Sequence, residues 1–394
     1  MSGSFPTRRR LLTAAALATV SLSAVTGVAH AAPADPLPVL PHVVFYTTAT
    51  MTPSSHPLAL PPAAQHAIDT SYVYRGRRTT FDSYLQRTSA RGLVVLRDGR
   101  MVTQKYWNGY TENSRFNSWS MGKSITSTAV GIALGEGKIA SVDDPITKYL
   151  PELKKSGYNG VPIKHILQMS SGQKYDESNY ANVTDGATGT TIRMVLGEPL
   201  MDQAEKSQKA RTSGTEFNYA SIDTFVLGAL VTRVTGQPLP VYVQNKIWHP
   251  AGMASSALVG EDYSGAAMAY ASYHATTRDF ARFGELFATG GKAFGKQIVP
   301  ADWVHDATRA TGPQVQPGHL YQGSRYGYGY QWWVGDGDRG DFMAVGILGQ
   351  YTYVWPAKNI VISQNSEDLD ADANMEEAIT AYRAVADTLI HGAS

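Results

Sequence analysis

The sequence predicts an α+β protein in which helices flank an antiparallel sheet and a helical lobe is inserted between its strands. Three observations support this fold class. A hairpin pattern occupies residues 92–107, helical spacing dominates from residue 120 to about 310, and short strand-like segments return between residues 326 and 364. Strands from both ends of the chain join one antiparallel sheet most simply when the helical middle forms a lobe beside it.

The strand elements are recognised by alternation and by their turns. Apolar and polar residues alternate from Gly92 to Trp107 around Arg97-Asp98-Gly99, whose residues accept the positive φ of a tight hairpin turn. The later strands are short, rich in aromatic and β-branched residues, and mostly flanked by Gly, Asp or Pro. They are predicted at residues 326–334, 342–347, 351–355 and 360–364, followed by a final helix at 373–390.

The helical middle begins with one long apolar helix. Helical spacing runs from Ser120 through Leu134, and Gly135 and Gly137 close it, which predicts a buried helix. Further helices are predicted at residues 144–150, 163–169, 192–196, 222–235, 239–247 and 277–288. A cleft between such a lobe and a sheet is a usual place for a ligand.

Composition and charge exclude several classes of function. The 394 residues are 43% hydrophobic and 17% charged, as in globular proteins, and their formal net charge is +1. No basic stripe of the kind that binds nucleic acid is present. The chain has no cysteine, so disulfides, thiolate metal sites and cysteine nucleophiles are excluded. None of the ten histidines pairs as His-x-x-x-His, and we expect no metal.

The first 31 residues have the features of a cleavable export signal. Residues 8–10 are arginines, an apolar stretch follows to about Val28, and Ala29 and Ala31 provide small residues for cleavage. A membrane anchor is the alternative, but the stretch is rich in Ala, Thr and Ser and short for a span. Because twin arginines favour export of a folded protein, we expect a secreted protein that uses the twin-arginine pathway.

The remaining chain divides into a linker and one folded domain. Residues 32–62 are expected to be a Pro-rich linker and residues 63–394 the domain, with a sheet lobe at about 63–118 and 311–394 and a helical lobe at about 119–310. After signal cleavage no stretch is long and apolar enough to span a membrane. A homodimer is the default expectation for assembly, since it is the commonest closed oligomer.

Ser120 and Lys123 are the strongest chemical signal. Positions i and i+3 share one helix face, so the amine can reach the hydroxyl, and a desolvated lysine can take the proton that keeps a serine from acting as a nucleophile. A capping serine beside a solvated lysine is the plain alternative. The same spacing recurs at Ser171 and Lys174, where Ser-Ser-Gly is typical of a helix C-terminus.

Tyr219 is the second element of the predicted site. It lies in Phe217-Asn218-Tyr219-Ala220-Ser221, just before a helix, where its hydroxyl can reach a cleft and relay protons. A Tyr-x-Ser motif after a Ser-x-x-Lys helix is found in serine β-lactamase-like hydrolases. A buried structural tyrosine is the alternative, since the chain contains 22 tyrosines.

From about Tyr84 to Ala386 the chain resembles the superfamily of class C β-lactamases and penicillin-binding proteins. Within it the chain is most similar to the 6-aminohexanoate-dimer hydrolases, which are nylon-oligomer amidases, and to related esterases. Besides the two motifs above, the resemblance rests on SVDDP at 141–145, ILQMSSG at 166–172, ATTRDFARFG at 275–284, KQIVPADW at 296–303 and YGYGYQW at 326–332. It implies a β-lactamase/DD-peptidase-like fold and an acyl-enzyme mechanism without a cofactor.

The resemblance also implies the roles of individual residues. Ser120 matches the nucleophile, Lys123 the general base and Tyr219 the proton relay, while the backbone N–H groups of Ser120 and Ile347 match the oxyanion hole. Penicillin-recognising enzymes carry Lys-Thr-Gly on the facing strand, but the matching strand here, residues 344–350, has no cation. The letters Lys-Ser-Gly at residues 155–157 precede Tyr219 in a helical loop and do not match that strand.

Two further residues are candidates for substrate binding. Tyr180 lies in the polar loop 173–190, which is similar to the lid of the nylon-oligomer hydrolases, although a solvated loop is the alternative. His274 precedes the 275–284 motif and can face the cleft or serve as a structural residue. Asp223, Arg278 and Asp279 are interpreted as capping or ion-pair residues.

The sequence therefore predicts an exported serine hydrolase that cleaves a small-molecule amide or ester through Ser120. Two alternatives remain open. One is a β-lactamase or D-Ala-D-Ala carboxypeptidase, which export suits and the missing Lys-Thr-Gly opposes. The other is a non-catalytic binding protein with this fold, which the intact Ser120, Lys123 and Tyr219 oppose.

Overall fold

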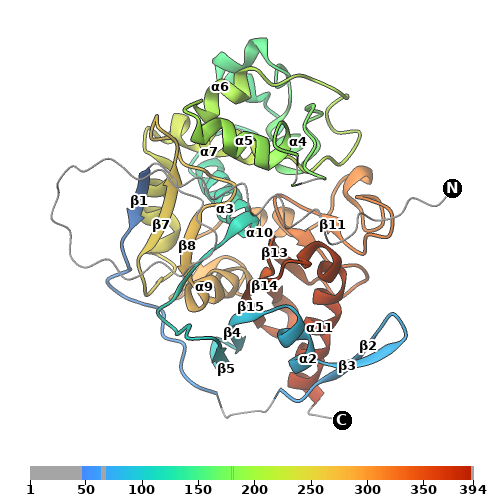
Figure 1. Ribbon diagram of the computed structural model, residues 1–394. Helices are drawn as coiled ribbons and strands as arrows, with labels where there is room; N and C mark the ends of the chain where they lie inside the picture. Colours follow the sequence, from blue (N-terminus) through green and yellow to red (C-terminus); the bar gives the residue numbers. More distant parts are fainter. Residues whose placement is uncertain (1–46, 64–67, 179, 181, 392–394) are drawn as a thin grey trace.

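The computed structural model describes residues 47–63, 68–178, 180 and 182–391, and a seven-stranded antiparallel sheet lies at its centre (Figure 1). The strand order is β11-β12-β13-β14-β15-β4-β5, so the N-terminal hairpin pairs with a C-terminal strand. The strands are Ala90–Arg97 (β4), Arg100–Tyr106 (β5), Gly327–Tyr328 (β11), Trp333–Val334 (β12), Phe342–Gly346 (β13), Gln350–Trp355 (β14) and Ile360–Ser366 (β15). The predicted α+β fold class is confirmed. The predicted export signal lies outside the described residues.

Both faces of this sheet are covered. In β4, Val94 and Leu96 belong to one buried cluster, whereas Leu93 and Val95 belong to a second cluster on the other face. Helix α9 (Thr277–Ala288) packs on the first face, and α2 (Phe81–Arg87) and α11 (Ala371–His391) cover the second (Figure 1). Because neighbouring residues enter different cores, residues 93–96 of the strand are all apolar instead of alternating. Helix α9 was expected within the helical lobe, but its amphipathic face packs on the sheet.

A second, four-stranded sheet has the order β1-β7-β8-β6. Its strands are Thr47–Met51 (β1), Arg115–Asn117 (β6), Ala257–Glu261 (β7) and Tyr273–Thr276 (β8). The segment from β1 onward was expected to belong to a linker, yet it is tied to the domain. After β1, the N–H of Leu58 donates to the carbonyl of Gly252, and the N–H of Ala63 donates to the carbonyl of Met101, each at 2.8 Å. Residues 47–63 therefore connect the outer strands of both sheets.

The helical lobe is built around two buried helices that pack on each other, α3 (Gly122–Gly135) and α7 (Ser221–Thr235). The remaining helices are Ile163–Leu167 (α4), Gly186–Val195 (α5), Leu200–Glu205 (α6), Leu239–Val243 (α8) and Ala301–Ala307 (α10). Two small hairpins complete the described chain, Ser71–Tyr74 (β2) with Arg77–Thr80 (β3) and Lys292–Ala293 (β9) with Lys296–Gln297 (β10). The long buried helix predicted after Ser120 is confirmed as α3.

Gln331 joins the large sheet to the helical lobe. A single strand was predicted over residues 326–334, but the chain reverses between β11 and β12, and Gln331 has a φ of 65° there. Its carbonyl accepts from the Ser124 hydroxyl at 2.7 Å, its side-chain oxygen accepts from Thr224 at 2.6 Å, and its amide donates to the carbonyl of Leu167 at 2.9 Å. This buried side chain fixes β12 to α3, α4 and α7.

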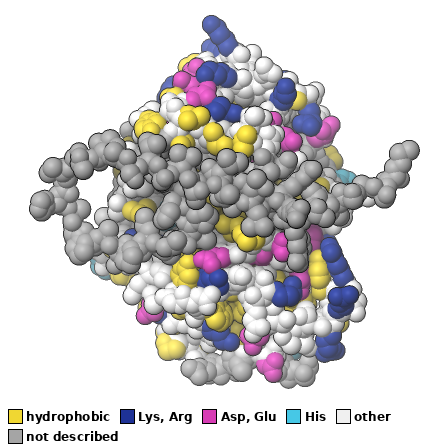
Figure 2. All heavy atoms as spheres, viewed as in Figure 1, with side chains coloured by type: hydrophobic (Ala, Val, Ile, Leu, Met, Phe, Trp, Pro, Cys, Tyr) yellow, Lys and Arg dark blue, Asp and Glu magenta, His cyan; other side chains and the backbone are white. Residues whose placement is uncertain are grey.

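The surface carries charges of both signs. On the face drawn in Figure 2, Lys and Arg side chains are interspersed with Asp and Glu side chains, in keeping with the net charge of +1. Within the described part of the chain, none of the helices combines the length and the apolar character that crossing a bilayer requires.

Candidate active site

Ser120 lies in a short 3₁₀ turn that precedes α3 and spans Trp119–Met121 (η1). The turn is anchored to the four-stranded sheet, because the N–H of Ser118 donates to the carbonyl of Tyr273 at 2.8 Å. Trp119 has a φ of 44°, a left-handed conformation that is uncommon for a bulky side chain. The turn leaves Ser120 half-buried at the junction between the sheet and the helix.

Lys123 is buried, and its ε-amine contacts three oxygen atoms. Its Nζ donates to Ser120 Oγ at 2.8 Å, to Ser221 Oγ at 2.9 Å and to the carbonyl of Tyr270 at 3.2 Å. Burial lowers the pKa of Lys123 to about 8, and the negative charge of Glu177 opposes part of this effect. An amine with such a pKa is partly neutral near physiological pH and can accept the proton of the adjacent hydroxyl.

Tyr219 is held beside the amine by its two neighbours in the chain. The N–H of Asn218 donates to the carbonyl of Met169 at 2.7 Å, and the N–H of Ala220 donates to Met169 Sδ at 3.3 Å. Lys123 Nζ lies 4.8 Å from the centre of the Tyr219 ring. The aromatic rings that pack around Tyr219 are those of Phe217, Tyr328 and Trp333. The structure thus brings Ser120, Lys123 and Tyr219 together.

The end of β13 lies against the turn that carries Ser120. A Cβ built at Gly346 would lie 3.1 Å from Ser120 N and within the contact distance of the Ser118 carbonyl oxygen. Only glycine allows the two backbones this approach. Ile347 follows Gly346 directly, in a turn. The strand itself, with the sequence FMAVG, contains no Lys or Arg.

Glu177 and Ser221 belong to the same cluster and were not singled out from the sequence. The Ser221 hydroxyl donates to Glu177 Oε1 at 2.7 Å, and its N–H donates to Oε2 at 2.7 Å. Both residues are buried, with 7% and 1% of their surface exposed. The third position of Tyr-x-Ser was a signal for Ser221, whereas an acidic residue in a polar loop gave no indication that it would turn inward.

The two candidates for substrate binding have different settings. Tyr180 is half-buried in the loop before α5, and its carbonyl accepts from the Thr188 hydroxyl at 2.7 Å. His274 lies in β8, where it pairs with Asn117 of β6 and Leu258 of β7. Burial and the charge of Arg115 lower the pKa of His274 to about 4, so this imidazole is neutral at pH 7. Neither setting assigns a role in substrate binding.

Other sequence candidates lie outside this cluster. Ser171 is buried and Lys174 is exposed. Helix α4 ends at Leu167, and the left-handed residue that follows it is Met169 with a φ of 51°, so Gly172 lies beyond the helix end that was expected there. Asp279 forms an ion pair with Arg282 at 2.9 Å, as expected for a structural residue. Within the described ranges, no three His, Asp or Glu side chains are grouped closely enough to hold a metal ion.

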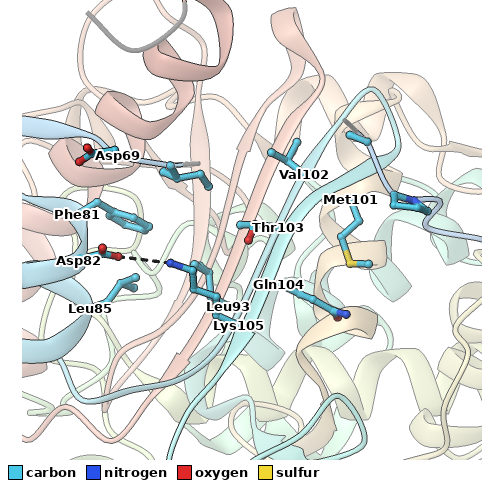
Figure 3. A pocket seen from close by; sticks show the side chains of 13 residues that line it. Asp69, Phe81, Asp82, Leu85, Leu93, Met101, Val102, Thr103, Gln104 and Lys105 are labelled. Atoms are coloured by element: carbon cyan, nitrogen blue, oxygen red, sulfur yellow. Dashed lines mark ion pairs between the residues drawn. The ribbon is translucent and has the colours of Figure 1, made fainter. Parts of the chain in front are cut away.

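One cavity of the described structure is lined by residues outside the Ser120 cluster. It has a volume of about 870 Å³ and lies between α2 and β5, where Asp82 and Lys105 form an ion pair at 3.6 Å (Figure 3). Apolar side chains such as Phe81 and Met101 line the rest of it. Since none of its lining residues belongs to the Ser120 cluster, we do not treat it as the active site.

Comparisons with known proteins agree with this geometry. A beta-lactamase family profile matches residues 78–387. The 6-aminohexanoate-dimer hydrolase of Paenarthrobacter ureafaciens is 28% identical over 304 residues, which cover 75% of this chain and 77% of the relative. A Salmonella agona protein provisionally named a D-alanyl-D-alanine carboxypeptidase is 25% identical over 217 residues, 48% of each chain. A Bacillus anthracis structure provisionally named a 6-aminohexanoate-dimer hydrolase superimposes with a TM-score of 0.75 at 23% identity, covering 88% of this chain and 90% of that one.

Proposed function

The chain belongs to the beta-lactamase family and is a serine hydrolase, and on this premise we propose that Ser120 attacks the carbonyl carbon of an amide or ester and forms an acyl-enzyme. One observation carries the proposal: a buried lysine whose Nζ lies 2.8 Å from Ser120 Oγ. A serine hydroxyl becomes a strong nucleophile only when a neighbouring base removes its proton. Lys123 is placed to be that base.

The reaction proceeds in two halves. Lys123 Nζ takes the proton of Ser120 as Oγ bonds to the carbonyl carbon, and the N–H groups of Ser120 and Ile347 stabilise the oxyanion. When the bond to the leaving group breaks, the Tyr219 hydroxyl donates a proton to the leaving nitrogen or oxygen and regains one from Lys123. Water then attacks the acyl carbon and gives a proton to the same pair. The bond between the acyl carbon and Ser120 Oγ breaks, the acid leaves, and the pair returns the proton to Oγ, which restores Ser120.

The chemistry of β13 separates the amide or ester reading from the penicillin-recognising alternative. The relative named as a carboxypeptidase supports that alternative, as does the family. A substrate carboxylate would need a cation on the strand that faces Ser120, but the FMAVG sequence of β13 provides none. Similarity to the 6-aminohexanoate-dimer hydrolase over 75% of the chain favours a small linear amide as the substrate.

Three substrates measured in parallel test the proposal. The mature protein is assayed with p-nitrophenyl butyrate, the linear 6-aminohexanoate dimer and nitrocefin, each against Ser120→Ala. Cleavage of the ester or the dimer without nitrocefin turnover, abolished in Ser120→Ala, is expected. Nitrocefin turnover alone would replace this proposal with a β-lactamase. A protein inert to all three and to a fluorophosphonate probe would be a binding protein that has lost turnover.

We also propose that the protein is exported through the twin-arginine pathway. The arginines at residues 8–10, the apolar stretch after them and the small residues at 29 and 31 support this. Replacing all three arginines with lysine keeps the charge but removes the twin-arginine feature. The wild-type protein should appear outside the cytoplasm, and the triple variant should remain inside. Equal export of both would overturn the assignment.

A further inference from the structure

Behind Lys123 lies a buried carboxylate for which the proposed reaction has no use so far. Hydrogen bonds connect Ser120 to Lys123, Lys123 to Ser221, and Ser221 to Glu177, with distances of 2.8, 2.9 and 2.7 Å. The Ser221 hydroxyl therefore accepts from the amine and donates to the carboxylate. This polarity requires an acceptor on the far side of Ser221, and Glu177 provides it with both oxygens engaged.

A structural explanation for Glu177 exists and must be separated from a role in the reaction. Ser221 is the first residue of α7, and the methyl group of Ala220 at the N-cap cannot accept a hydrogen bond from the helix. Glu177 accepts the N–H of Ser221 and so serves as a cap delivered from a distant loop. A cap would act on stability alone. A charge partner of Lys123 would act on the pH dependence of the amine.

Lys123 is a cation whose charge interacts with that of Glu177. The ionisable groups whose electrostatic interaction with Glu177 the structure shows are Lys123 of α3, Asp223 of α7, Tyr175, Tyr270 and Tyr328. Burial raises the pKa of each of these tyrosines, so they are uncharged over the working pH range. Burial also raises the pKa of Asp223 to about 7. Lys123 is thus a positive charge that Glu177 can stabilise, and Asp223 is a second buried carboxylate that interacts with Glu177.

We infer that Glu177, acting through Ser221, is a positioning residue for Lys123 that holds the ε-amine against Ser120 and maintains its basicity. The inference rests on the proposed function of Ser120. Without the carboxylate, burial alone would govern the amine, which would become a weaker base and lose the acceptor that orients its bridge. With it, the amine stays basic enough to remove the serine proton while remaining partly neutral.

The rate at which a fluorophosphonate labels Ser120 is the measurement, taken from about pH 6 to about pH 10, because it reports activation of the serine without any substrate. The variants are Glu177→Gln, which removes the charge but keeps the shape, Ser221→Ala, which breaks the bridge, and Ser221→Thr, which keeps a hydroxyl. Asp223→Asn and Glu285→Gln are the controls, since each removes another buried carboxylate. Circular dichroism and urea unfolding report the fold of every variant.

In the wild type we expect labelling to rise with pH around a midpoint near 8, the pKa of Lys123. In Glu177→Gln the midpoint should fall by about one pH unit and the plateau by about tenfold, so the loss is smaller at low pH than at high pH. Ser221→Ala should lower the plateau, and Ser221→Thr should recover most of it. Neither control should move the midpoint.

Several results would overturn the inference. A rate in Glu177→Gln that falls by one factor at every pH would show a cap alone, and a midpoint that moves only in Asp223→Asn would assign the titration elsewhere. If Glu177→Gln does not fold, the variants Ser221→Ala and Ser221→Thr provide the test. An unchanged plateau of the labelling rate in Ser221→Ala would then refute a role for Ser221 between Lys123 and Glu177. If wild-type Ser120 is not labelled at all, the proposed function fails instead, which keeps the two failures distinct.

Discussion

Replacing Gly346 with alanine should lower the catalytic rate strongly while the protein still folds. The added Cβ would meet the carbonyl oxygen of Ser118 and lie 3.1 Å from Ser120 N, both of which are backbone atoms that no side-chain rotation can move. Restoring ordinary contacts requires β13 and the turn before α3 to separate by about 1 Å. Such a misplacement costs about 100-fold in rate, and overpacking costs about 1–3 kcal/mol of unfolding free energy.

The assay compares kcat/KM for p-nitrophenyl butyrate with the urea-unfolding free energy of the same protein. Gly284→Ala is the control for crowding in the core, because its Cβ would lie 2.6 Å from a methyl of Val361 and 2.7 Å from a methyl of Thr352, neither of which belongs to the turn that carries Ser120. We expect comparable losses of stability in both variants but a loss of kcat/KM in Gly346→Ala alone. Full activity in folded Gly346→Ala would refute the idea that the end of β13 belongs to the catalytic geometry.

Three further outcomes are expected. Tyr219→Phe should lower kcat about 100-fold for an amide but much less for a p-nitrophenyl ester, whose leaving group needs no proton; equal losses would argue against proton donation. Gln331→Leu should lower the unfolding free energy in urea by about 3 kcal/mol, since Thr224 Oγ1 and the Leu167 carbonyl lose their buried partner. Burial raises the pKa of Glu285 to about 7, so the folded state binds its proton more tightly than the unfolded state, and stability falls as pH rises from about 4.5 to 7. At pH 8, Glu285→Gln should therefore unfold at a higher urea concentration than the wild type, with an unfolding free energy larger by about 2–3 kcal/mol at most. Below pH 4.5 the two proteins should unfold at the same urea concentration. A gain in stability that does not depend on pH would exclude this explanation.

Local signals predicted much of the fold because they depend on neighbouring residues. Asp98 and Gly99 take φ values of 52° and 69° in the predicted hairpin turn, and the predicted helix at residues 277–288 is α9. Strands β6, β7 and β8 were not predicted. They have three to five residues each, and their pairing partners come from distant parts of the chain, so no local alternation identifies them.

The site was predictable to the extent that its residues share a helix or a motif. Lys123 follows Ser120 by three residues, so helical periodicity alone placed them together. Tyr219 needed the resemblance to a family, because its approach to Lys123 depends on the contact of its neighbours with Met169. Glu177 could not be found, since a loop that folds inward leaves no periodic pattern in the sequence.

The pairing of β4 with β15 has a consequence for the order in which the protein can be made. Arg91 and Glu367 are bound by an ion pair across 276 residues of sequence, so the hairpin of β4 and β5 leaves the ribosome long before its partner strand exists. Until then the edge of β4 that pairs with β15 has no partner strand, and an unpaired strand edge of this kind promotes aggregation. The seven-stranded sheet can therefore be completed only near the end of translation, when β15 has been synthesised. Fragments that stop short of β15 should be insoluble, which makes the two lobes a single unit of biosynthesis.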